Sequence, residues 1–141
     1  MEVEAMPVVT VVLEMCELFR GRDVIWYIDN VAALSAFVKG GSEAEDLDRA
    51  AAVLSLATAR LQAQFWFEYI QSESNWADEL SRSLEASAWT VANGFALRRV
   101  QVPAWPWAVR QQDLVCTLEM ALGAALGEER GGAAVEVVEL R

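Results

Sequence analysis

Three acidic residues stand next to the predicted ends of secondary-structure elements. Asp29 directly follows the apolar run at residues 24–28, Asp78 lies three residues after Asn75, and Glu4 precedes the first predicted helix. Carboxylates that gather at one edge of a sheet repel one another unless a divalent cation neutralises them. Mg²⁺ or Mn²⁺ suits such all-oxygen ligands, and a pair of these ions can stabilise the attacking and leaving oxygens of a phosphodiester.

Two predicted strands and the helices around them position these acids. Residues 24–28 are a continuous apolar run of β-branched and aromatic side chains, typical of a strand that is buried on both faces. Residues 64–70, which are rich in aromatic side chains, are expected to form a second strand. Helices are expected at residues 8–20, 31–38, 42–62 and 76–84. The long helix at 42–62 has one apolar face, formed by Leu47, Ala50, Ala51, Leu54, Ala57 and Leu61. Because strands joined by helical crossovers pair in parallel, the pattern predicts an α/β fold with both strands ending at one edge of the sheet.

Polar residues and glycines mark the expected helix ends. Asn30 can cap the helix at 31–38, and Gly40 is followed by a second glycine that stops this helix. Ser42 and Glu45 have the spacing of a capping box at the start of the long helix.

Composition narrows the possible chemistry. Among 141 residues, 55% are hydrophobic, which favours a soluble folded domain, and no apolar stretch is long enough to span a membrane. The net charge of −10 argues against simple electrostatic binding of nucleic acid. The absence of histidine excludes a His-dependent nucleophile and imidazole ligands. Two isolated cysteines fit a reducing compartment, so a cytoplasmic or nuclear location is expected.

Three segments carry a resemblance to a known family. Ile-Asp-Asn-Val-Ala-Ala-Leu at 28–34, Val-Lys-Gly-Gly-Ser at 38–42 and Ser-Asn-Trp-Ala-Asp-Glu-Leu-Ser-Arg at 74–82 resemble the ribonuclease H-like domain of retrotransposon reverse transcriptases. That family's pattern is a strand ending in Asp-Asn or Asp-His, a helical stretch, a second strand and an Asn-x-x-Asp-x-Leu-Ser-Arg block. The resemblance covers about residues 2–83, and the last block is its most specific part.

The resemblance implies metal-dependent hydrolysis of the RNA strand in an RNA–DNA hybrid, within a retroelement reverse-transcriptase polyprotein. It assigns three residues as catalytic ligands of Mg²⁺ or Mn²⁺: Asp29, Asp78 and Glu4. It places three further side chains beside the substrate: Asn30, Asn75 and Arg82.

The chain also departs from the family pattern. The family's first catalytic Asp lies on a strand that belongs before Glu4, so we expect a ribonuclease H-like layer whose parallel strand pair is flanked by helices and whose N-terminal hairpin strands are missing. The strand at 24–28 then has an open edge, and activity is reduced or lost. If Pro7 is the first residue of its helix, Glu4 falls outside that helix.

Simpler interpretations of the same residues stay open. Asp29 can terminate a turn, Asp78 can complete a capping box with Asn75, and Glu4 and Arg82 can be solvated. A second hypothesis is therefore a non-catalytic remnant or protein-interaction module with a ribonuclease H-like fold. A third is an unrelated small α/β domain.

The chain is expected to divide into three parts. Residues 1–84 form the partial ribonuclease H-like domain, residues 85–127 a helical extension, and residues 128–141 a flexible tail. A helix is expected at 111–126. The Trp/Pro-rich connector before it either presents an interaction surface or folds back over the core.

Overall fold

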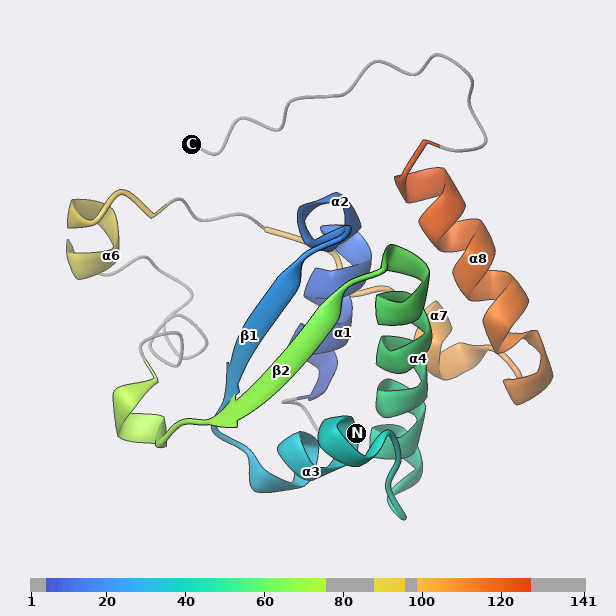
Figure 1. The fold of residues 1–141 in the computed structure, drawn as a ribbon, viewed down its shortest axis with the longest axis horizontal. Coiled ribbons are helices and arrows are strands. Elements are labelled where there is room, and N and C mark those ends of the chain that lie inside the picture. The colour runs from blue at the N-terminus through green and yellow to red at the C-terminus, as the bar shows by residue number, and fades with distance from the viewer. Residues whose placement is uncertain (1–4, 76–87, 96–98, 128–141) are drawn as a thin grey trace.

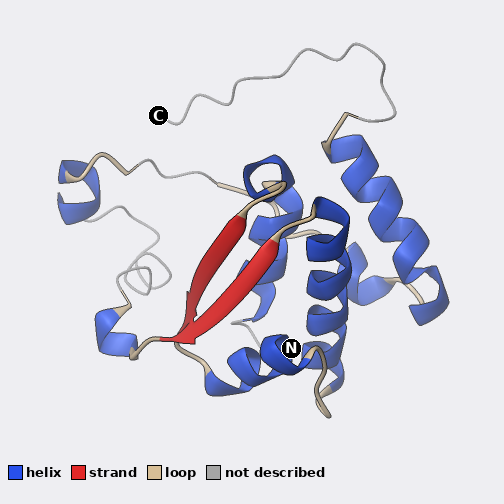
Figure 2. Cartoon of the chain, in the orientation of Figure 1, coloured by secondary structure: helices blue, strands red, loops and turns tan. Residues whose placement is uncertain are grey.

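The chain folds as an α/β unit in which helices flank a pair of strands (Figures 1 and 2). The computed structural model describes residues 5–75, 88–95 and 99–127. The described elements are α1 (Ala5–Glu14), α2 (Cys16–Phe19), β1 (Asp23–Ile28), α3 (Val31–Lys39), α4 (Glu45–Leu61), β2 (Gln64–Tyr69), η1 (Ser72–Ser74), α6 (Ala88–Ala92), α7 (Trp105–Ala108), η2 (Gln111–Asp113) and α8 (Leu114–Ala125).

The two strands are parallel, as the sequence predicts. Their register runs from the pair Asp23 and Gln64 to the pair Ile28 and Tyr69, and α3 and α4 form the crossover between them. Both strands therefore end at the same edge of the sheet. Within the part of the chain that the structure describes, β1 pairs with β2 alone.

One face of the sheet packs against the helices through a cluster of aromatic rings. Phe19 of α2 lies 5.5 Å from Phe65, and Phe37 of α3 lies 5.3 Å from Phe67, measured between ring centroids. Trp26 of β1 completes this inner face at 6.2 Å from Phe65. Aromatic pairs at these separations add to the stabilisation that burial of their apolar surface provides.

No described element covers the opposite face of the sheet, so the prediction that the strand at 24–28 is buried on both faces is wrong. The exposed fractions of Ile25, Tyr27 and Trp66 are 63%, 59% and 65%. In Figure 1, α1 and α4 lie behind and beside the strands, and no described helix lies in front of them. Parallel sheets usually have both faces covered by helices, and here only one face has this cover among the described residues.

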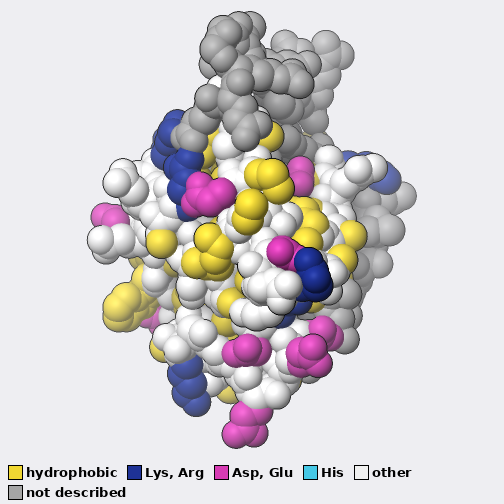
Figure 3. Space-filling model, turned by 90° about the vertical axis from the view of Figure 1, so that its right-hand side faces the viewer, with side chains coloured by type: hydrophobic (Ala, Val, Ile, Leu, Met, Phe, Trp, Pro, Cys, Tyr) yellow, Lys and Arg dark blue, Asp and Glu magenta, His cyan; other side chains and the backbone are white. Residues whose placement is uncertain are grey.

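The helical side of the molecule has a continuous core. The predicted apolar face of α4 is buried, and α1 and α8 pack against this helix. The side chains of Leu114, Leu118 and Leu122 on α8 belong to the same core as those of α1. Trp105 and Trp107 pack against it too, which favours a connector that folds back over the core. On the side formed by α8, apolar and charged side chains are interspersed without a broad basic area among the described residues (Figure 3).

Helix ends differ from the sequence prediction in two places. The helix expected at 8–20 is interrupted at Met15, whose backbone φ and ψ are −121° and 34°, so α1 and α2 are separate. The predicted capping box of Ser42 and Glu45 is wrong, because α4 begins at Glu45, and Ala44, not Ser42, occupies the N-cap position. Instead, the Ser42 hydroxyl accepts a hydrogen bond from the Ala44 amide, and the Asp48 carboxylate accepts one from the Ser42 amide.

Two further predicted ends can be compared with the structure. Gly40 ends α3 with a left-handed φ of 74°, as the sequence predicts, because glycine adopts this conformation without strain. The helix expected at 111–126 begins with the short η2 turn and continues as α8. The helix expected at 76–84 lies outside the described residues.

Candidate functional site at the carboxyl edge of the sheet

The candidate site lies where the two parallel strands end. Asp29 is the first residue after β1, and its side chain is partly buried. The Ile70 amide donates a hydrogen bond to the Ile28 carbonyl oxygen at 3.0 Å, which extends the strand pairing to the position next to Asp29. This edge therefore brings the segment that follows β2 close to the candidate acid of β1.

Asn75 contacts Asp29 directly. Its side-chain Nδ2 donates a hydrogen bond to Asp29 Oδ2 at 3.1 Å, across 46 residues of sequence. Both side chains are partly buried, so the bond fixes the orientation of the carboxylate. A carboxylate has several acceptor lone pairs, so Asp29 can accept this bond and still bind a cation.

Asn30 positions the helix that leaves the site. Its Oδ1 accepts a hydrogen bond from the Ala33 amide at 2.9 Å, which confirms the predicted cap of α3. Asn30 thereby sets the direction in which the chain leaves Asp29. Its predicted contact with substrate stays a prediction.

Glu4, Asp78 and Arg82 lie outside the described residues. Ala5, the first described residue, is buried and already helical in α1. Pro7 is therefore not the first residue of its helix. Figure 1 shows that α1 begins at the end of the molecule at which both strands finish.

The donor set that the structure describes fits one part of a metal site. Asp29 supplies carboxylate oxygens, which are the ligands that Mg²⁺ and Mn²⁺ prefer. No group of three or more acidic or cysteine side chains that could hold a metal ion is found among residues 5–75, 88–95 and 99–127. A complete site at this edge would need ligands in addition to Asp29.

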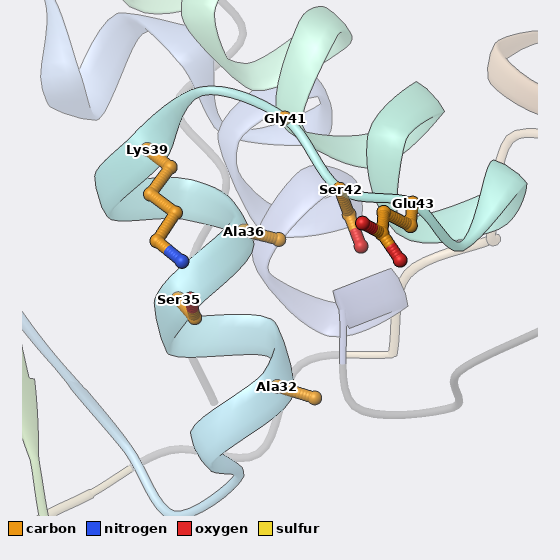
Figure 4. Close-up of a pocket in the computed structure, with 7 residues that line it drawn as sticks. All are labelled: Ala32, Ser35, Ala36, Lys39, Gly41, Ser42 and Glu43. Atoms are coloured by element: carbon orange, nitrogen blue, oxygen red, sulfur yellow. The ribbon is translucent and has the colours of Figure 1, made fainter.

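A cavity of about 470 Å³ lies between α3 and the loop at residues 41–43 that follows this helix. This cavity was not predicted from the sequence. Its lining comprises Ala32, Ser35, Ala36, Lys39, Gly41, Ser42 and Glu43. In Figure 4 the Lys39 side chain runs back along the helix toward Ser35, while Ser42 and Glu43 face the side of the helix that carries Ala32 and Ala36. The glycines at 40 and 41 could have indicated this cavity, since two glycines after a helix predict a sharp turn, and a sharp turn can leave a hollow beside the helix.

Comparison with known proteins gives no assignment. No family model, no curated protein and no solved structure matches the chain. The described helices are all too short or too polar to cross a lipid bilayer.

Proposed function

We propose that this chain is a ribonuclease H-like unit of a retroelement reverse-transcriptase polyprotein, whose chemistry is hydrolysis of the RNA strand of an RNA–DNA hybrid with Mg²⁺ or Mn²⁺, at a reduced rate in this chain. The observation that carries the proposal is the hydrogen bond from Asn75 to Asp29. It joins the two most informative segments of the resemblance, the Asp-Asn that follows β1 and the Asn-x-x-Asp block. The resemblance requires these two segments to meet at the carboxyl edge of the sheet, and the bond between Asn75 and Asp29 supports that arrangement.

The same bond limits where the second predicted ligand can lie. Asp78 is three residues after Asn75, and a fully extended chain spans at most about 3.6 Å per residue. Three residues of chain reach at most about 11 Å from Asn75, which is bonded to Asp29. This reach is compatible with both carboxylates binding one cation, or a pair of neighbouring cations.

The proposed chemistry assigns a role to each residue. Asp29 and Asp78 would hold the cations, and Glu4 would supply a further carboxylate. When bound, Mg²⁺ or Mn²⁺ would supply the means to activate a water and to neutralise charge on the phosphate. Asn75 keeps Asp29 in its binding orientation, and Asn30 and Arg82 contact the substrate.

Metal binding and hybrid cleavage test this proposal. We expect Mn²⁺ binding measured by calorimetry to be lost in Asp29→Asn and to weaken about tenfold in Asn75→Ala, because the amide orients the ligand. Asp23→Asn is the matched control, since Asp23 is an exposed carboxylate at the opposite end of the same strand. Cleavage of the RNA strand of a labelled hybrid should follow the same order. Equal metal binding by the wild type and Asp29→Asn would contradict the proposal.

A second candidate function is a non-catalytic module that binds another protein segment. It is favoured by the open face of the sheet and by the pairing of β1 with β2 alone in the described part of the chain. This alternative predicts a folded protein that binds no Mn²⁺ at the edge carrying Asp29. The calorimetric experiment therefore separates the two functions.

A further inference from the structure

The open face of the sheet has a defined chemical character. The outer sheet face consists of Ile25 paired with Trp66, Tyr27 paired with Glu68, and Asp23 at its margin. All five side chains are exposed. The three large apolar side chains together present an area on the order of 400 Å², which is a substantial continuous patch for one protein.

The charge on this face has one sign. Asp23 and Glu68 lie on either side of the apolar residues, and neither β1 nor β2 contains a lysine or an arginine. Glu68 also fixes the central ring, because Trp66 Nε1 donates a hydrogen bond to its Oε1 at 2.5 Å. The result is a preoriented apolar surface with an acidic margin.

We propose that the outer sheet face binds an amphipathic helix of another protein segment, whose apolar stripe is flanked by lysine or arginine. Helices are the elements that normally cover the faces of parallel sheets. The apolar stripe would contact Ile25, Tyr27 and Trp66, while basic side chains would pair with Asp23 and Glu68. This inference is independent of metal binding at Asp29.

Charge decides against two other occupants. A second copy of the chain would bring the acidic margins of two molecules together, each molecule with a net charge of −10. Single-stranded nucleic acid can stack on exposed aromatic rings, but it also needs basic groups that track its phosphates. The outer sheet face offers acids in their place.

Peptide binding tests the proposal. The probe is a fluorescently labelled helical peptide of about 18 residues with a leucine stripe flanked by lysines. The control peptide has the same leucines, with glutamate in place of each lysine. We expect micromolar binding of the lysine peptide in fluorescence anisotropy, because the patch is about half the size of a standard interface. The glutamate peptide should bind at least tenfold more weakly.

Variants locate the binding surface. Trp66→Ser and Ile25→Ser should each weaken binding of the lysine peptide about tenfold or more, since central apolar contacts dominate affinity. Glu68→Gln should weaken it less and should reduce its dependence on salt. Val115→Ser on α8 is the control, because this valine is similarly exposed but lies on another element. If Trp66→Ser fails to fold in circular dichroism, Ile25→Ser alone decides the question.

Several results would overturn the proposal. These are equal affinity for the two peptides, no detectable binding of either, and binding that the sheet variants leave unchanged. Two others would assign the face to a different occupant. A dimer in sedimentation that Ile25→Ser dissociates would identify a second copy of the chain. Direct binding of a labelled single-stranded oligonucleotide that Trp66→Ser abolishes would identify nucleic acid.

Discussion

The two faces of the sheet carry similar residues in different environments. On the inner face, Trp26 and Phe65 pack against Phe19 of α2, whereas on the outer face Ile25 and Trp66 are exposed by more than half. Both faces carry large apolar side chains, but the outer face also carries Asp23 and Glu68. The described helices pack on the inner side only, so Ile25 and Trp66 stay exposed.

The largest expected effect tests this difference with one residue type on one strand. Ile28 is 5% exposed and Ile25 is 63% exposed, and they lie on opposite faces of β1. We expect Ile28→Ala to lower the free energy of unfolding by about 2–4 kcal/mol, because it removes buried methyl groups and leaves a cavity. Ile25→Ala should change it by about 0.5 kcal/mol or less. Urea unfolding measures both, and similar losses would show that the outer sheet face is covered in solution.

This comparison also explains what the sequence predicts about the fold. The strands and their parallel pairing follow from apolar runs separated by helical segments, and the apolar period of α4 predicts its buried face. The open sheet face could not be predicted, because a continuous apolar run does not specify how many of its faces have partners. The break at Met15 was missed because no glycine or proline marks it.

A smaller effect is expected where β1 passes into α3. Asn30→Ala should lower the free energy of unfolding by about 1 kcal/mol, because the Ala33 amide loses its acceptor at the start of the helix. Asn30→Asp is the matched control, since a carboxylate oxygen also caps a helix. A pronounced loss of hybrid cleavage in Asn30→Asp with unchanged stability would indicate a contact with substrate. Equal destabilisation by both variants would contradict the capping role.

The candidate site was predictable in its positions but not in its contacts. The sequence places Asp29 after a strand and Asn75 before a predicted helix, but it does not indicate that the two side chains meet. A helix cap uses the Asn75 carbonyl oxygen as an acceptor, whereas the bond to Asp29 uses the amide nitrogen as a donor. Both roles are compatible, so the local pattern around Asn75 gave no sign of its long-range partner.

The two cysteines allow a similar comparison between a buried and an exposed residue on the helices. Burial raises the pKa of the Cys16 thiol above its ordinary value of 9.0, whereas Cys116 on α8 is exposed. As the pH rises, the unfolded chain loses its Cys16 proton before the folded chain does. The stability contributed by the buried thiol is therefore fully present below about pH 9 and is lost as the pH rises through the raised pKa.

Two measurements check this expectation. The urea midpoint of the wild type should fall more steeply above about pH 9 than that of Cys16→Ala, while Cys116→Ala should follow the wild type. A thiol reagent should modify Cys116 rapidly and Cys16 only when the protein unfolds. Rapid modification of both thiols in the native protein would show that the chain between α1 and α2 opens locally and exposes the Cys16 thiol.

The smallest effect is expected at the surface between α4 and α8. Arg60 Nε and Glu119 Oε2 form an ion pair at 3.0 Å, but the glutamate is exposed. Because water and salt screen such a pair, Glu119→Gln should cost about 0.5 kcal/mol or less, and the difference should vanish at about 1 M salt. Leu118→Ala, at the neighbouring buried position, should cost several times more. If Glu119→Gln cost as much as Leu118→Ala, charge pairing rather than apolar packing would hold α8 against the core.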